Sequence, residues 1–259
     1  MSFTWLALLL TSALFAGMLM TFEVGRRVGV KRLATDPDGL TKGAGAAEGA
    51  VFALLGLLLA FTFSGAASRF EERKWFINSE ANAIGTAYLR IDLLPEEAQA
   101  PLRDLFRRYT ENRASVYQGA DKKEDVLAGL AEGAALQNEI WKQAMAAMRL
   151  PDASNQATML LTPALNEMID ITATRVMATR NHPPNIIFLL LAALSLVGAL
   201  LVGYGTSANK DRSWFHQVTF ALVITLAIYV IVDLEYPRLG LIKVDNADQA
   251  LLDVRASMR

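Results

Sequence analysis

The sequence lacks cysteine and has only two histidines in 259 residues. Disulfide bonds, thiolate chemistry and cysteine-based metal sites are therefore excluded. His182 and His216 do not have the HxxxH spacing of a metal-binding helix. We expect His182 at a helix end and His216 near a membrane interface, with no metal site and no cofactor.

The chain also lacks an excess of either positive or negative charge. The formal net charge is −1, and basic and acidic residues are interspersed throughout residues 69–183. A nucleic-acid surface needs clustered positive charge, so nucleic-acid binding is not expected. The chain instead carries neighbouring carboxylates, most of which we expect to lie on solvated helix faces: Glu71-Glu72, Glu96-Glu97 and Asp233-Leu234-Glu235. Adjacent or alternate residues on a helix point apart, and no GxSxG-like nucleophile motif occurs. We predict that the protein is not an enzyme.

Hydrophobic residues are abundant, at 53% of the chain, and they are clustered. Four nearly uncharged stretches have about the 20 residues that a helix needs to cross a bilayer. They are Phe3 to Val24, Ala47 to Ala67, Asn185 to Tyr204 and Trp214 to Val232. The first has no basic segment before it and exceeds the apolar run of a signal peptide. We interpret it as a retained span, with a cleaved signal as the alternative.

The spacing of these stretches predicts an all-α integral membrane protein with four transmembrane helices. A first transmembrane pair (1–68) precedes a large polar helical insert (69–183), a second pair (184–234) and a C-terminal tail (235–259). Residues 25–47 are glycine-rich and turn-rich, which predicts a short loop between the first two spans. The second span is followed by helix-compatible residues, so one long helix should leave the membrane and continue to about Leu94.

The insert shows amphipathic helical periodicity in three further segments. One starts at Pro95, the second covers residues 121–150, and the third carries Leu161, Leu165 and Met168 on one stripe. Asn181-His182-Pro183-Pro184 interrupts the last helix. The insert is therefore expected to be a helical bundle.

Pairing the spans places the insert and both termini on one side of the membrane. Cytoplasmic loops are enriched in lysine and arginine. Here the basic residues of the short loops nearly equal those of the insert ends and tail, so charge alone does not choose the side.

Two ionisable residues are candidates for intramembrane or interfacial charge. Glu23 and Glu48 lie near span ends, and charge at membrane depth is costly and often functional. Interfacial placement is the alternative for both. Gly45 and Gly49 form a GxxxG that would permit close helix approach.

The second span carries the most distinctive pattern. Ala53, Leu57, Phe61, Ser64 and Ser68 fall on one helical face. This face is apolar in the middle and turns to hydroxyls toward the insert. Several copies around an axis would form a narrow hydrophobic constriction that gates by dewetting. Ordinary helix packing also produces such spacing.

Several motifs resemble known proteins. Gly56 to Phe61, followed by Arg69-Phe70, resembles the second span of bestrophins. More of the chain is similar to the bestrophin-like family of prokaryotic membrane proteins. The residues that carry this similarity are Glu71-Glu72-Arg73-Lys74, Glu80 to Arg90, Leu165-Asn166-Glu167, Arg175, Pro183-Pro184, Asp233, Pro237 and Gly240.

Bestrophins are pentameric anion channels whose second spans ring a hydrophobic neck. The resemblance implies neck positions for Leu57, Phe61 and Ala53, with Ser64 and Ser68 as pore-lining candidates. Ala53 is a departure, since a smaller residue shortens or widens a constriction. The polar Arg and Asn that follow the neck phenylalanine in bacterial bestrophins are replaced by Thr62, Phe63 and Ser64. No acidic cluster like the calcium clasp of animal bestrophins is present.

The resemblance thus implies a homopentameric chloride channel in the cell (inner) membrane, with the insert and both termini cytoplasmic. Its partners would be the lipid bilayer, further copies of the same chain and small anions. The alternative is a non-conducting membrane scaffold or signalling component whose insert binds a partner.

Overall fold

The computed structural model describes residues 3–36, 44–116, 123–208 and 214–258. Most of the described residues are helical, and the chain divides into two compact units. We call Met1–Phe70 with His182–Lys243 the apolar unit, and Glu71–Asn181 with Val244–Arg259 the polar unit. The last sixteen residues of the expected tail thus belong with the insert, and the residues before them belong with the spans.

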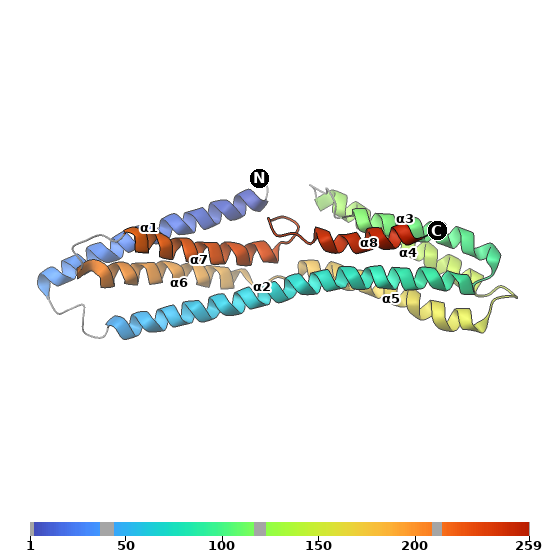
Figure 1. The fold of residues 1–259 in the computed structure, drawn as a ribbon, viewed down its shortest axis with the longest axis horizontal. Helices are drawn as coiled ribbons and strands as arrows, with labels where there is room; N and C mark the ends of the chain where they lie inside the picture. Colours follow the sequence, from blue (N-terminus) through green and yellow to red (C-terminus); the bar gives the residue numbers. More distant parts are fainter. Residues whose placement is uncertain (1–2, 37–43, 117–122, 209–213, 259) are drawn as a thin grey trace. The chain divides into compact units, whose positions relative to one another are not determined.

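The apolar unit contains α1 (Phe3–Thr35), the first part of α2 (Ala44–Leu89), α6 (Asn185–Gly205) and α7 (Trp214–Glu235), with a short 3₁₀ turn, η2 (Thr206–Ala208), after α6. Four helical stretches of the described residues are long and apolar enough to cross a membrane. They are Phe3–Thr35, Gly45–Leu93, Asn155–Ala208 and Trp214–Glu235. Helix α1 packs against α6 and α7, and α2 runs along their other side (Figure 1).

Helix α1 corrects the prediction of a loop from Gly25. The helix continues through Arg26 to Thr35, and Asp36 is its first non-helical neighbour. Nothing before Pro37 breaks a helix, whereas a residue preceding proline disfavours helical geometry. The expected turn at residues 37–43 lies outside the described residues.

The glycines in this extension allow close contact with α6. A Cβ on Gly25 would lie 2.0 Å from the Leu200 carbonyl oxygen, and one on Gly203 would lie 2.1 Å from that of Phe22. By contrast, a Cβ on Gly45 or Gly49 would meet nothing within 4 Å in this chain. The close helix approach is therefore made by Gly25 and Gly203, and Gly45 and Gly49 do not contribute to it.

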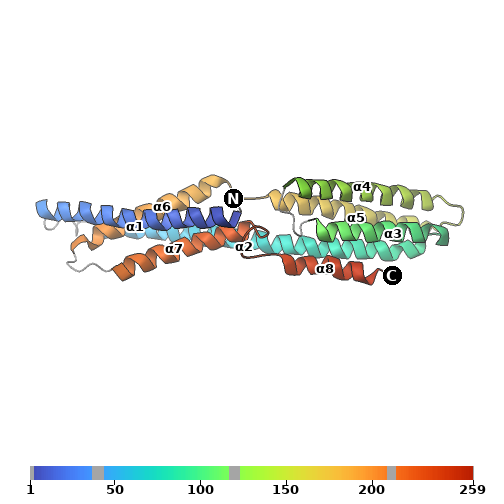
Figure 2. The ribbon, with the colours of Figure 1, turned by 90° about the horizontal axis from the view of Figure 1, so that it is seen from above.

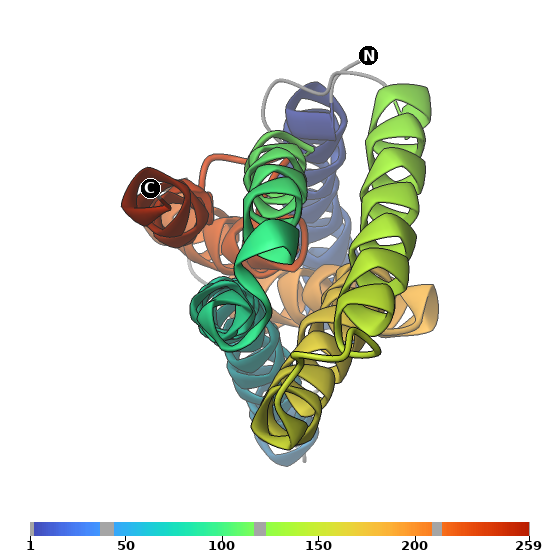
Figure 3. The ribbon, with the colours of Figure 1, turned by 90° about the vertical axis from the view of Figure 1, so that its right-hand side faces the viewer.

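The polar unit contains the rest of α2, the short 3₁₀ turn η1 (Arg90–Leu93), α3 (Glu96–Ser115), α4 (Lys123–Ala147), α5 (Asn155–Arg180) and α8 (Asp245–Ser257). Within it, α2 and α3 lie between α8 on one side and α4 and α5 on the other (Figures 2 and 3). Helix α3 starts after Pro95 with two acids in its first turn, as its dipole favours. Ser154 caps α5 by accepting the Ala157 N–H at 3.1 Å.

The expected C-terminal tail contains a helix. Residues 245–257 form α8, which packs against α3. Leu251 is fully buried, and the Oγ1 hydroxyl of Thr110 in α3 lies 3.6 Å from the sulfur of Met258. Burial of this apolar face stabilises the short helix, which is too short to be stable alone.

Candidate functional site

One face of α2 is left uncovered in the single chain. Ala53, Leu57, Phe61, Ser64 and Ser68, which we call the α2 stripe, are all exposed. Leu57 is 52% exposed and Phe61 is 66% exposed. These are large apolar side chains, and leaving them in water is costly. The α2 stripe must therefore contact something outside the single chain.

The opposite face of α2 fixes the direction of the stripe. Leu55 is 2% exposed and packs with Leu191 and Ile228 of α6 and α7. One turn before the polar unit, Ala66 is fully buried with Ile231. Because these residues lie on the far side of a 3.6-residue helix, core packing turns the α2 stripe outward. The same spacing continues in exposed Trp75, Asn78 and Asn82 of the polar unit.

The two candidate glutamates lie away from the α2 stripe. Glu23 is held on α1 by a local ion pair, in which the Nε of Arg27 donates to Oε1 at 2.8 Å and Arg26 lies 3.6 Å away. Glu48 lies nine residues before Leu57, on the opposite side of α2, with its carboxylate beside Gly205. A Cβ on Gly205 would stand 3.1 Å from Oε1 of Glu48.

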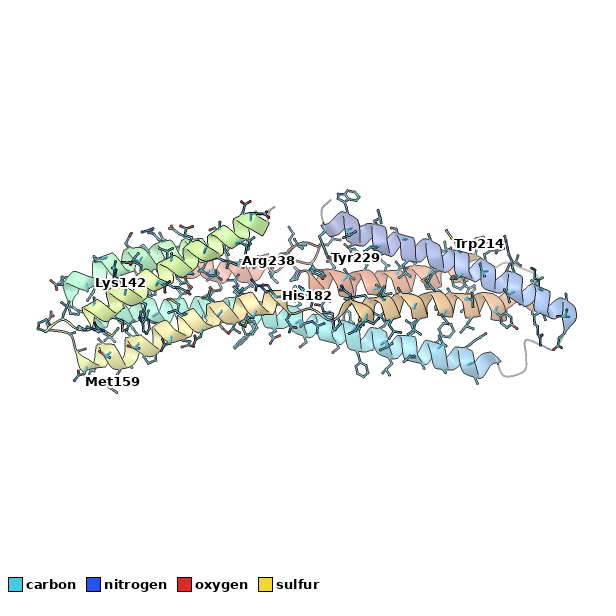
Figure 4. The ribbon with its side chains drawn as sticks, turned by 180° about the vertical axis from the view of Figure 1, so that it is seen from behind. Lys142, Met159, His182, Trp214, Tyr229 and Arg238 are labelled. Carbon is cyan, nitrogen blue, oxygen red and sulfur yellow. The ribbon has the colours of Figure 1, made fainter. Side chains whose placement is uncertain are left out.

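A partly buried ion pair joins α2 to the end of α7. Nε of Arg69 donates to Oε1 of Glu235 at 2.9 Å, and Nη2 donates to the same oxygen. Nδ1 of His182 lies 3.5 Å from Oε2 of Glu235, and its ring stacks on Tyr236 with centroids 4.5 Å apart. Figure 4 labels His182 between α5 and α6. Glu235 is 1% exposed, so the prediction of a solvated carboxylate was wrong there.

Asp233 is the second carboxylate misjudged as solvated, because it is 2% exposed. Its oxygens accept the backbone N–H of Leu241 at 2.9 Å and of Ile242 at 2.7 Å. A Cβ on Gly240 would lie 1.8 Å from Oδ1 of Asp233, so only glycine fits there. Asp233 thus fixes the loop that follows α7.

The polar unit encloses a charged network. Oε1 of Glu80 accepts from Nε of Arg113 at 2.6 Å, and Oε2 accepts from Nη1 of Arg175 at 2.5 Å. Arg175 also donates through Nη2 to Asp248 of α8 at 3.1 Å. Burial raises the pKa of the Glu80 carboxyl, but the positive charges of Arg175 and Arg113 outweigh burial, so this pKa lies below its ordinary value.

Tyr109 borders this network. Its hydroxyl lies 2.9 Å from Thr172 Oγ1 and accepts from Gln137 Nε2 at 2.8 Å. Burial, followed by the negative charge of Glu80, raises the pKa of Tyr109 to about 12. Tyr109 is therefore neutral and structural at physiological pH. The network leaves no titratable group open to a substrate, and it fixes α2, α3, α5 and α8 to one another.

Metal binding finds no support in the described residues, where no group of three or more His, Asp or Glu side chains could hold an ion. The candidate site is the α2 stripe, with the Arg69–Glu235 pair where the apolar part of α2 ends.

The family model for the bestrophin-like domain matches residues 12–248 of the chain. The protein belongs to the bestrophin-like family. The match includes α2, both apolar helix pairs and most of the polar unit. No curated protein sequence matches the chain significantly.

A solved structure with the same fold is a variant of a bacterial bestrophin homologue from Klebsiella pneumoniae. The two share 14% sequence identity with a TM-score of 0.67, over 93% of this chain and 98% of that one. At this identity the likeness shows the fold alone. This bestrophin-like protein therefore has the bestrophin fold along nearly its whole length.

The sequence had indicated some of these features. Helical spacing predicted that the five residues of the α2 stripe share one face. The bestrophin-like motifs included Glu80, Arg175 and Asp233. The pairing of Arg69 with Glu235 was missed because 166 positions separate them. Asp233 and Glu235 lie in the last turn of the otherwise apolar α7. Their position directly after the apolar run could have indicated that they are buried.

Proposed function

We propose that this bestrophin-like protein is one subunit of a homopentameric, anion-conducting pore in the cell membrane. The four apolar helices span the bilayer, and the α2 stripes of the copies surround the axis. The carrying observation is the exposure of Leu57 and Phe61 in the single chain, at 52% and 66%. Membership in the bestrophin-like family supports this function.

The chemistry of the α2 stripe favours a conduit over a purely lipid-facing surface. It passes from Ala53 and Leu57 through Phe61 to the hydroxyls of Ser64 and Ser68. A narrow apolar ring conducts only when it is wetted. The positive edges of aromatic rings then favour anions as they pass. In this proposal Leu57, Phe61 and Ala53 form the neck, and chloride is the permeant ion.

The polar unit continues the conduit into the cytoplasm, with both termini on the same side. The exposed face of α2 supports this arrangement, because it becomes polar at Asn78 and Asn82. The side assignment itself rests on the bestrophin-like resemblance, since basic residues do not favour either side.

Reconstitution tests the function directly. The assembly mass of the detergent-solubilised protein should correspond to five copies, and liposomes should show chloride flux. Phe61→Ala should raise that flux several-fold by widening the neck. Leu222→Ala, a truncation to alanine of a half-exposed apolar residue on α7, should leave it unchanged. A monomer, a dimer or a chloride-impermeable pentamer would end this proposal.

A non-conducting scaffold is the second candidate. It is favoured by exposed apolar side chains on α5, where Met159 is 74% exposed and Met177 is 71% exposed. Methionine-rich surfaces suit partner binding. Absence of flux, together with a protein partner lost in Met159→Ser and Met177→Ser, would support this alternative.

A further inference from the structure

A cavity of about 260 Å³ lies in the apolar unit, between α2 and α6. Its walls are almost wholly apolar. They include Leu58, Phe61, Ile187, Phe188, Leu190 and Leu191. Arg69 of α2, Glu235 at the end of α7 and Pro183 just before α6 also line it. The cavity is therefore apolar along its length and charged at one end.

The charged end offers hydrogen-bond donors. In the part of the chain that the structure describes, Arg69 donates from Nε and Nη2, and both groups are directed to Glu235. Nη1 lies beside Gly65, where an added Cβ would stand 3.3 Å from it. The guanidinium-bearing side chain is 25% exposed, whereas that of Glu235 is 1% exposed. The accessible charge at this end is therefore positive.

The dimensions suit one narrow hydrocarbon chain. The volume falls just below the range of about 300–1,000 Å³ that is typical of drug-sized ligands. At 1.5 Å rise per residue, the wall from Leu58 to Arg69 is about 16 Å long. A cavity of about 260 Å³ is too small for a sterol or a two-chain lipid.

We propose that this cavity binds a single-chain anionic amphiphile, a free fatty acid, whose carboxylate accepts hydrogen bonds from Nη1 of Arg69. The hydrocarbon chain lies along Leu58, Ile187 and Leu190. Glu235 repels this carboxylate less than Arg69 attracts it, because the Glu235 side chain is 1% exposed and that of Arg69 is 25% exposed.

The bound chain also contacts the α2 stripe. Phe61 lines the cavity and is 66% exposed on the stripe, so an occupant fixes the orientation of its ring. This consequence rests on the proposed function, in which Phe61 forms part of the neck. Binding itself does not depend on conduction.

Equilibrium binding of radiolabelled decanoate to the full chain in lipid nanodiscs tests the site. Binding should be saturable, and decanol should bind at least tenfold more weakly because it lacks the carboxylate. The double variant Arg69→Gln with Glu235→Gln replaces the ion pair by two neutral side chains, so no buried charge is left without a partner. It should weaken decanoate binding by about tenfold or more.

A variant that keeps the ion pair intact provides an independent test. Leu190 lines the cavity, so the larger side chain of Leu190→Trp should fill it and abolish saturable binding. Val197→Trp is the matched control, because Val197 lies two turns further along α6 and is similarly exposed, at 43% against 46% for Leu190. It should leave binding unchanged. Non-saturable partition, equal binding of decanol, or full binding by Leu190→Trp would overturn the proposal.

Flux measured on the same samples separates the two proposals. If the protein binds decanoate but does not conduct, the pore proposal fails and the site stands. Conduction without saturable binding overturns the site alone, as when a second copy fills the cavity. In a conducting protein, decanoate should change flux at least twofold in the wild type and not in the double variant. An equal effect on both proteins would overturn the coupling to Phe61.

Discussion

Glu80 of α2 and Arg175 of α5 form a buried ion pair, with Oε2 and Nη1 only 2.5 Å apart. Both side chains are removed from water, at 0% and 3% exposure. Arg113 reaches the other carboxylate oxygen. One acidic group thus balances two guanidinium groups from different helices, and Asp248 supplies the second negative charge.

Removing the charge of Glu80 should destabilise the polar unit. Glu80→Gln leaves two buried guanidinium groups with one carboxylate. Breaking a buried ion pair in this way lowers the free energy of unfolding by about 3–5 kcal/mol. Hydrogen exchange along α2 from Ile77 to Leu89 should accelerate strongly. Glu139→Gln, on the more accessible α4, should change exchange little. Native-like protection in Glu80→Gln would show that the network is not stabilising.

Acid should weaken the polar unit for a related reason. The Glu80 pKa is lower in the folded protein than its ordinary value of 4.5. A depressed carboxyl pKa stabilises the folded state fully above the ordinary value, and this stabilisation is lost as pH falls through the folded pKa. The contribution of Glu80 to thermal stability should therefore be complete and independent of pH above about pH 5, and it should fall below pH 4.5. Glu80→Gln should show a smaller acid-induced loss, and an identical pH profile would contradict this.

Helix α8 should depend on one buried contact more than on its surface pair. Asp248→Asn removes the charge partner of Arg175 and should expose the end of the chain to limited proteolysis. Arg255→Ala removes a pair with Glu111 whose side chains are 30% and 57% exposed, and such pairs contribute about 0–1 kcal/mol. Equal protease sensitivity in both variants would mean that Asp248 has no special role.

The packing of α1 on α6 should be sensitive to a single methyl group. In Gly203→Ala the new Cβ would lie 2.1 Å from the backbone oxygen of Phe22, so the helices must separate. The yield of monodisperse protein in size-exclusion chromatography should fall sharply. Gly49→Ala meets nothing within 4 Å in the chain and serves as the control. A normal profile for Gly203→Ala would rule out this close approach.

Much of the fold follows from local sequence properties. The four apolar runs, the unbroken continuation of α2 and the helix ends at Pro95 and Pro183-Pro184 are set by hydrophobic length and backbone sterics. The outward direction of the α2 stripe follows from helical spacing, because Leu55 and Ala66 face the core on the opposite side. These properties depend on residues within a few helical turns of one another, so they can be predicted from one segment of the sequence.

The sequence had less information about which polar groups become partners. Gly25 and Gly29 indicated a loop, but α6 packs on them and α1 continues to Thr35. Asp233 and Glu235 read as solvated carboxylates, although both are buried.

The sequence by itself determined that this chain has four apolar helices and an exposed stripe on α2, because hydrophobicity and helical period are properties of the local chain. Tertiary structure alone decided that Arg69 pairs with Glu235, that Arg175 holds Asp248 of α8, and that a cavity lies beside Phe61. The reason is physical: each depends on distant segments packing together, and burial then requires every charge they enclose to find a partner.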